Sequence, residues 1–380
     1  MQSYNKKVMI VLSREENLSC DTGYVDDGKL YVIHKSYPIL LVYDLRDFSY
    51  RVVTHNVMPY EYVQYGVREL FKIKNRLYII PSLRVRTIIV YDLSTDRYWI
   101  HKAFKDEVDC GGTYRAYLQN DSFYLCSLDL RKGILKADIE EADGFTVVSP
   151  EWDDVFGDKE NDLLGWYFIG KGGIFAFPYG TDKVFRFSMK GEIIQSYNLA
   201  MNDVVEDVSY DGKIFYFVRK KDAMIFAWDP ESEIQGKCRI TKFKASNREK
   251  YIGSSSVNKD LFTCIFREIG RVDFINLQTG SELRINLDKF FSPEMPFSNA
   301  YSVRGMLFDR KLLLLPNVAE NFILIDIDTG IAEVISCKLR DMDIATAKSL
   351  KYQNQTLKQI YEENEENTLK GFIGTLRYQS

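Results

Sequence analysis

The chain has 380 residues, with 50 basic and 54 acidic side chains and a formal net charge of −4. So small a net charge gives no general attraction to nucleic acid or to an anionic membrane surface, so neither is an expected partner. No stretch approaches about eighteen consecutive apolar residues, and the sequence therefore predicts no membrane-spanning helix.

The N-terminal segment contains one short apolar run, Val8–Leu12. Arg14, Glu15 and Glu16 follow it in place of the small residues of a leader cleavage site. We therefore expect a strand here rather than a secretory leader, and a cytoplasmic protein. The 25 tyrosines and 24 phenylalanines favour β structure throughout, because large flat side chains pack well on a pleated surface.

Two motifs recur along most of the chain. The first is a polar turn followed by an apolar strand, and it occupies residues 27–33, 74–80, 120–125, 171–177, 211–217, 258–262 and 309–315. The second is a strand that ends in an acidic or polar turn, at residues 42–45, 90–95, 136–139, 186–189, 227–230, 274–280 and 324–330. Asp, Asn and Gly dominate the turns because they tolerate positive φ or bond to the nearby backbone.

The spacing of the first motif defines the repeat. From Leu30 to Leu312 its reference positions advance by 47, 46, 51, 40, 47 and 51 residues, which leaves room for four short strands in each unit. The sequence thus predicts an all-β fold, a seven-bladed β-propeller of four-stranded blades over residues 1–340, followed by a helical tail at 341–380. The seven repeats fall near residues 15–53, 66–102, 114–149, 165–199, 206–243, 252–287 and 302–339.

The repeats resemble those of the kelch family. Tyr91–Thr95, followed by Tyr98 and Trp99, is similar to the third strand, turn and aromatic fourth strand of a kelch repeat. The resemblance covers about residues 15–340, but the double glycine that follows the second kelch strand is missing. Prolines stand at that place in three blades, Pro81, Pro178 and Pro316. What the resemblance implies is the fold and a bias towards interaction modules, since enzymes are a minority among kelch-like propellers.

The two ends of the chain have separate expectations. Val8–Leu12 is a candidate to pair with the outer edge of the last blade and latch the ring, although the seventh repeat already has its own fourth strand. Residues 341–366 carry apolar side chains at helical intervals, and Asn367 and Thr368 are suited to cap a second short helix. We expect this tail to pack on the side of the propeller, with docking of a partner as the alternative.

The chain shows no signature of metal, cofactor or nucleophile chemistry. Its three histidines, His34, His55 and His101, fall in unrelated positions, and its six cysteines form no CxxC pair, so we expect buried, reduced thiols and no cofactor. The glycine clusters do not fit a phosphate-binding loop. The acidic stretch at 153–162 is expected to be solvated, with a Ca²⁺ site as a weaker alternative.

One candidate site lies where the first strand of each blade begins, beside the central channel. Equivalent positions there hold Arg68, Arg115, Trp166, Glu206 and Arg304. Three arginines at one channel mouth favour a carboxylate or phosphate ligand, so an acidic partner group or an anionic small molecule is a candidate occupant. The alternative is that Glu69, Glu206 or acids between blades neutralise the arginines.

A second candidate site is the rim formed by the D–A and B–C connections, where A to D denote the four strands of each blade in order. Propellers commonly bind partners on such loops, which gather above a rigid ring. The candidate residues on this rim are Arg84, Arg86, Trp152, Arg219 and Arg271. Aromatic residues among mixed charges are typical of protein interfaces.

The sequence therefore favours a non-catalytic recognition or scaffold propeller that binds a protein or peptide through this rim and the channel mouth. A propeller enzyme, a lyase or hydrolase acting on an anionic sugar or peptide, is the first alternative. A carbohydrate-binding module is the second, and it requires Trp152 and Trp166 to be exposed and coplanar.

Overall fold

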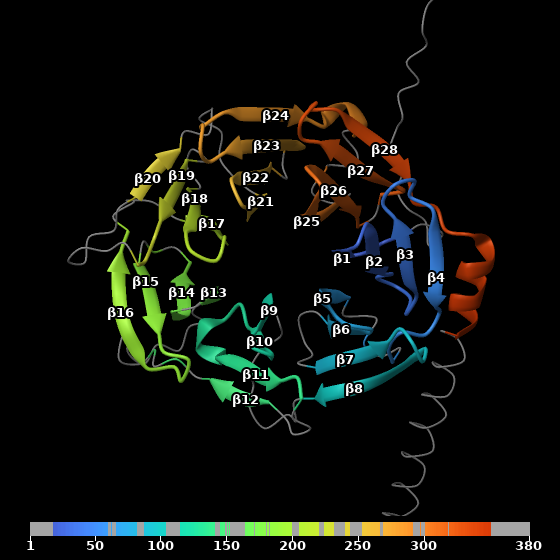
Figure 1. Ribbon diagram of the computed structural model, residues 1–380, viewed down its shortest axis with the longest axis horizontal. Helices are drawn as coiled ribbons and strands as arrows, with labels where there is room; N and C mark the ends of the chain where they lie inside the picture. Colours follow the sequence, from blue (N-terminus) through green and yellow to red (C-terminus); the bar gives the residue numbers. More distant parts are fainter. Residues whose placement is uncertain are drawn as a thin grey trace, which may run out of the picture.

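Seven four-stranded antiparallel sheets stand around a central axis in the computed structural model of the chain (Figure 1). The all-β seven-bladed propeller predicted from the repeats is thereby confirmed. Each blade is built from one continuous stretch of chain whose four strands pair in sequence order, and the first strand of every blade is the innermost.

The structure describes residues 18–59, 62, 66–81, 87–103, 115–140, 145–148, 150, 152, 164–170, 172–179, 181, 183–199, 205–219, 224–231, 240–243, 253–266, 269–291, 297, 301–317 and 319–350. Within these ranges, no side chains are described at 102–103, 205–206, 240–243, 253 and 302–304.

The strands divide among the blades as follows. Blade 1 holds β1 (Gly23–Asp26), β2 (Lys29–Ile33), β3 (Leu40–Asp44) and β4 (Tyr50–Thr54). Blade 2 holds β5 (Val67–Ile73), β6 (Arg76–Pro81), β7 (Thr87–Asp92) and β8 (Arg97–Ala103). Blade 3 holds β9 (Arg115–Gln119), β10 (Ser122–Cys126), β11 (Ile134–Asp138) and β12 (Thr146–Val148), with the 3₁₀ turn η1 (Leu130–Lys132) between β10 and β11. Blade 4 holds β13 (Gly165–Gly170), β14 (Gly173–Pro178), β15 (Lys183–Phe187) and β16 (Ile193–Asn198).

The remaining three blades complete the ring. Blade 5 holds β17 (Val205–Tyr210), β18 (Phe215–Arg219), β19 (Ile225–Trp228) and β20 (Ile240–Phe243). Blade 6 holds β21 (Gly253–Asn258), β22 (Leu261–Phe266), β23 (Arg271–Asn276) and β24 (Glu282–Asn286), followed by the 3₁₀ turn η2 (Asp288–Phe290). Blade 7 holds β25 (Tyr301–Phe308), β26 (Lys311–Pro316), β27 (Asn321–Asp326) and β28 (Ala332–Ser336).

The hydrophobic core lies between neighbouring blades. Because side chains alternate across a strand, each central strand sends one set towards the blade before it and the other towards the blade after it. Tyr124 of β10 and Phe185 of β15, for example, belong to one buried cluster, and Phe175 of β14 and Phe217 of β18 belong to the next. Every blade thus depends on its neighbours for burial.

The ring closes where blade 7 meets blade 1. The inner strands β1 and β25 contact each other, and residues just before β1 bond to the backbone of blade 7. The Leu18 amide donates to the Cys337 carbonyl at 3.4 Å and the Cys20 amide donates to the Pro316 carbonyl at 2.9 Å. The segment Val8–Leu12 lies outside the described residues, so its role as a latch stays a prediction.

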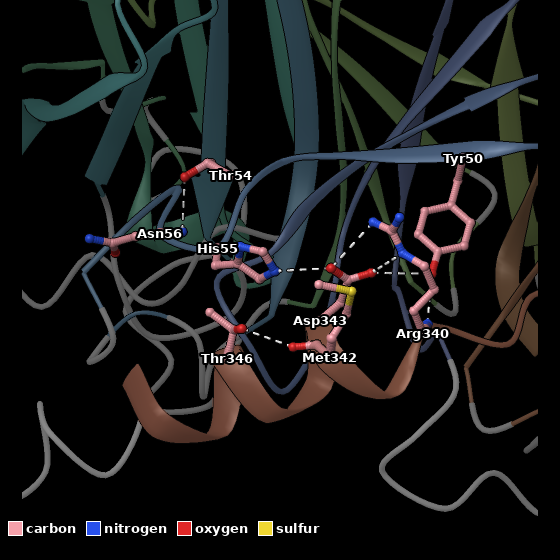
Figure 2. A network of polar contacts seen from close by, with 8 residues as sticks. All are labelled: Tyr50, Thr54, His55, Asn56, Arg340, Met342, Asp343 and Thr346. Carbon is pink, nitrogen blue, oxygen red and sulfur yellow. Dashed lines mark hydrogen bonds and ion pairs between the residues drawn. The ribbon is translucent and has the colours of Figure 1, made fainter.

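A helix described over residues 341–350 packs against the outside of blade 1 (Figure 1). Ile344 and Ala347 are buried in the cluster that joins blades 1 and 7. Figure 2 shows Asp343 between His55 and Arg340, with the Arg340 Nε atom at 2.7 Å and the His55 Nε2 atom at 3.3 Å from its carboxylate. The first part of the tail therefore packs on the propeller, while residues 351–380 lie outside the described ranges.

The described cysteines are reduced and lie in the core. Four of the cysteines, Cys20, Cys126, Cys264 and Cys337, are described, and all four are buried free thiols. No helix in the described ranges is long and apolar enough to cross a membrane. A cytoplasmic location stays a prediction.

Candidate functional site

The inner strands surround a cavity of about 290 Å³ in the central channel. Glu69 and Arg115 are its charged lining residues. Its hydroxyl groups belong to Tyr117, Ser209, Tyr210, Ser254, Ser255 and Ser256. The cavity is thus polar on several sides, and its volume lies near the lower limit of about 300 Å³ for small-molecule sites.

Arg115, at the start of β9, already has an anionic neighbour. Its Nη2 atom lies 3.6 Å from the Asp207 Oδ1 atom of blade 5, and its guanidinium sits 4.7 Å from the ring centroid of Phe168 in blade 4. One arginine of the predicted cluster is therefore balanced by a carboxylate from within the fold. Asp207 was not predicted, although it directly follows Glu206, which was.

Asp207 is buried and held by several donors. The backbone amides of Val208 and Ser255 donate to its two oxygens, and the Ser255 hydroxyl donates to Oδ2 at 2.8 Å. Burial holds the pKa of the Asp207 carboxyl above its usual value, although Arg115 and these donors act to lower it. The Ser209 and Ser255 hydroxyl oxygens lie 2.7 Å apart, which extends the network along the channel wall.

Three of the other four channel-mouth positions fall at irregularities of the inner strands. Arg68 lies at a register shift between Val67 and Glu69 in β5, and Glu206 lies at the corresponding shift in β17. Arg304 lies within the irregular pairing of β25 between Tyr301 and Gly305. Arg68 is half-buried and does not line the cavity, and the side chains of Glu206 and Arg304 are not described. Arg68 and Arg115 therefore occupy equivalent positions in the repeat, but only Arg115 lines the cavity.

Trp166 supports an exposed pair of apolar residues on the rim. It is buried, and its ring meets that of Tyr179 edge to face at 5.7 Å. Leu164 precedes β13 and Tyr179 follows β14, so a D–A connection and a B–C connection meet here. The Tyr179 amide donates a hydrogen bond of 2.7 Å to the Leu164 carbonyl. Leu164 is 46% exposed and Tyr179 is 44% exposed.

A short basic turn lies next to this pair. The 3₁₀ turn η1 carries Arg131 and Lys132, and Asp129 caps it by accepting a bond of 3.1 Å from the Arg131 amide. Asp129 also forms an isolated antiparallel bridge with Leu164. The side chains of Arg131 and Lys132 are partly exposed, so apolar area and positive charge adjoin on this part of the rim.

The predicted rim residues have other surroundings. Trp152 is only 3% exposed, and its Nε1 atom donates to the Leu130 carbonyl at 3.0 Å and to the Tyr167 hydroxyl at 2.9 Å. Trp152 and Trp166 are therefore both buried, and the exposed coplanar platform that carbohydrate binding requires is not formed by them.

The predicted rim arginines also make contacts inside the fold. Arg271 is buried, 3.0 Å from Asp273 and 4.0 Å from the ring centroid of Phe266. Arg219 is half-buried over the ring of Phe226 at 5.1 Å. Arg84 and Arg86 lie outside the described residues. In the part of the chain that the structure describes, no group of three or more His, Cys, Asp or Glu residues is placed to hold a metal ion.

No family model and no curated protein matches the chain. Solved propeller structures do match it at low identity. The β-propeller domain of Cps50 (Swd1) from Myceliophteria thermophila is 12% identical, with 86% of this chain and 98% of that chain covered and a TM-score of 0.54. KlAtg21, in a complex with the coiled coil of AgAtg16, is 10% identical, with 86% and 98% covered and a TM-score of 0.52.

A third match is PorZ, a surface component of the type-IX secretion system of Porphyromonas gingivalis, at 10% identity and a TM-score of 0.54. The match covers 87% of this chain but only 39% of the PorZ chain. At these identities, the three structures show a shared fold alone. None of the three is described as a kelch protein, so the kelch resemblance stays a prediction.

Proposed function

We propose that this propeller is a non-catalytic recognition module that binds a peptide segment of a protein partner across the rim of blades 3 and 4. The observation that carries the proposal is the exposed apolar pair of Leu164 and Tyr179. Leu164 is anchored by its backbone bridge to Asp129 of blade 3, and Tyr179 by its ring contact with Trp166 of blade 4. A rigidly held aromatic ring provides contact area with little loss of side-chain freedom on binding.

The charges beside this pair favour one class of partner. Arg131 and Lys132 adjoin the apolar pair, so acidic residues next to a large apolar anchor would find complementary charge. KlAtg21, which shares the fold, is described in a complex with the coiled coil of AgAtg16. This likeness supports the proposal that the fold can bind a protein partner, and the rim residues support the proposed position of the binding site.

The proposal is tested by selecting peptides from a displayed random library against the immobilised protein and measuring the affinity of the enriched peptides by calorimetry. We expect the enriched peptides to contain a large apolar residue flanked by acidic residues. The double variant Leu164→Ser/Tyr179→Ser should weaken their binding by tenfold or more, since loss of a central anchor typically costs about 2 kcal/mol or more.

Ile331→Ser is the matched control. Ile331 is 56% exposed and lies in the turn between β27 and β28, on the opposite rim, so its replacement should leave the affinity unchanged. The proposal fails if no peptide is enriched over an unrelated immobilised protein. It also fails if the enriched peptides bind the double variant and the wild type equally well.

A further inference from the structure

The channel cavity has no excess of charge to offer a ligand. Among the described residues that line it, the charged side chains are Glu69 and Arg115, one carboxylate and one guanidinium. The Arg115 Nη2 atom lies 3.6 Å from the Asp207 Oδ1 atom, and Glu69 also interacts within the fold. A charged ligand would lose its hydration here without gaining an opposite charge of its own, which is costly. The cavity is therefore suited to a neutral ligand.

Three consecutive blades contribute an aromatic wall to the cavity. Tyr117 of β9, Phe168 of β13 and Tyr210 of β17 line it. The ring centroid of Phe168 lies 6.2 Å from that of Tyr117 and 6.4 Å from that of Tyr210. Aromatic rings attract one another at such separations, in edge-to-face or offset arrangements. This wall favours a ligand that brings a ring of its own.

Arg115 adds a second surface that favours a ring. Its guanidinium already lies over the Phe168 ring, 4.7 Å from the ring centroid. Contact with a ring uses the face of a guanidinium, whereas the ion pair with Asp207 uses its N–H groups, so an aromatic ligand leaves the ion pair intact. An apolar cavity of about 150 Å³ is enough for benzene. The channel cavity, at about 290 Å³, therefore has room for one substituted or fused ring.

The hydroxyl groups of the lining favour a ligand that donates a hydrogen bond. Because the Ser255 hydroxyl donates to Asp207, its oxygen accepts from the Ser209 hydroxyl, 2.7 Å away. A hydroxyl has a single proton, so the Ser209 oxygen has only lone pairs to offer to the cavity that it lines. The Tyr117 hydroxyl has likewise used its proton, which it donates to the Tyr167 carbonyl at 2.7 Å. A bound ring is thus best matched if it carries an O–H or N–H group.

We propose that the channel cavity binds a neutral aromatic ring with one hydrogen-bond donor, a phenol or an indole, whose O–H or N–H group donates to Ser209. The ring has two sources, a tyrosine or tryptophan side chain of the partner or a free small aromatic molecule. This inference deepens the proposed function by adding a ligand class for the channel, and it rests on that proposal only in taking the channel as part of the recognition surface.

The experiment uses the full chain and pairs of probes that differ in the donor. Para-cresol is compared with its methyl ether, and skatole with its N-methyl derivative, by calorimetry and by the shift in melting temperature. We expect para-cresol and skatole to bind at roughly millimolar affinity, given their few atoms. Their methylated counterparts should bind about threefold more weakly or worse, because they lack the donor. Benzoate and benzylammonium, the charged probes, should not bind.

Two variants locate the site. Ser209→Ala should weaken the binding of para-cresol about two- to tenfold and leave that of its methyl ether unchanged, because only para-cresol donates to the serine oxygen. Ser256→Leu should abolish the binding of every probe, because Ser256 lines the cavity and the larger side chain fills it. Ser281→Ala, an exposed change in the turn between β23 and β24, is the matched control and should bind the probes as the wild type does.

The melting temperatures without ligand verify that the variants fold. Ser209→Ala keeps the bonds from Ser255 to Asp207, so it tests the site even where Ser256→Leu does not fold. The proposal is overturned if no aromatic probe binds, if the methylated or charged probes bind as tightly as para-cresol and skatole, or if Ser209→Ala binds para-cresol as tightly as the wild type.

Further probes separate the two sources. Binding of Nα-acetyl-tyrosine amide or Nα-acetyl-tryptophan amide supports a partner side chain, whereas binding of para-cresol or skatole without the capped residues supports a free small molecule. The Leu164→Ser/Tyr179→Ser variant should bind para-cresol normally, so failure at the rim and failure in the channel give different results.

Discussion

Single side chains fasten the C-terminal helix to blade 1, among them Asp343, which contacts Tyr50 and His55. Its carboxylate is buried and accepts bonds from Arg340, His55 and the Tyr50 hydroxyl. Although burial acts to raise it, the Arg340 guanidinium and His55 hold the pKa of Asp343 below its usual value. A carboxyl whose pKa is lower in the folded protein than in the unfolded chain stabilises the fold at pH values above its pKa in the unfolded chain. This contribution is lost as the pH falls through the pKa of the group in the folded protein.

We expect Asp343→Asn to lower the free energy of unfolding at pH 7 by about 1–3 kcal/mol, since it removes charge-assisted bonds from a buried position. The wild type should lose this advantage on acidification below about pH 4, the ordinary range of the group. Urea unfolding at pH 7 and pH 3 measures both effects. Asp341→Asn, an exposed change in the same helix, is the control and should have little effect. Equal destabilisation by Asp343→Asn at both pH values would contradict the assigned charge.

The sequence positions of the candidate rim residues did not predict where their side chains lie. Trp152 was expected on the rim because it stands in an acidic connection, yet its indole bonds to Leu130 and Tyr167 inside the core. Arg271 was expected in a basic turn, yet Asp273 and Phe266 enclose it. Leu130 lies in η1 and Tyr167 in β13, so a local pattern of charges and aromatics around Trp152 does not show these contacts. Asp273 is on the same strand as Arg271 and Phe266 is on the preceding strand, but the sequence pattern did not show that they enclose the arginine.

At the scale of the element, the A–B turns are where sequence and structure agree best. Asp27 and Gly28 both have positive φ, of 47° and 67°, as a tight hairpin requires. A Cβ atom added to Gly28 would meet nothing within 4 Å, so Gly28→Ala changes only the backbone preference. We expect this variant to lower the free energy of unfolding by about 1 kcal/mol, the penalty of a left-handed conformation for alanine.

Thermal and urea unfolding compare Gly28→Ala with Lys29→Ala, an exposed change in the same hairpin that lacks positive φ. An equal loss in the two variants would show that the turn conformation is not responsible.

The positions of β-bulges were harder to predict from the sequence than the positions of turns. The shifts beside Arg68 and Glu206 insert one residue into a strand, and the inserted residue is neither a glycine nor a proline in either case.

At the scale of the whole molecule, the seven-fold repeat predicted the ring because no single blade can bury both of its faces. The ends of the ring were less predictable, since closure depends on contacts between residues about three hundred positions apart. Leu18 bonds to Cys337, and Ile344 of the tail packs into the same cluster as Leu30 and Leu315. The repeat motifs do not predict these contacts. The only sequence signal for them is the helical spacing of apolar residues in the tail.

Removing the tail tests whether the ring depends on it. A chain that ends at Arg340 loses the buried contacts of Ile344 and Ala347 and the bonds of Asp343. We expect the free energy of unfolding to fall by about 2–4 kcal/mol, given the apolar area and charge-assisted bonds removed. The contact between β1 and β25 does not involve the tail, so the shortened chain should still unfold in one transition with a β-sheet circular dichroism spectrum. Failure to fold would show instead that the helix is part of the closure. Ile344→Ala in the full chain, with a smaller loss than the truncation, would separate apolar packing from the Asp343 network.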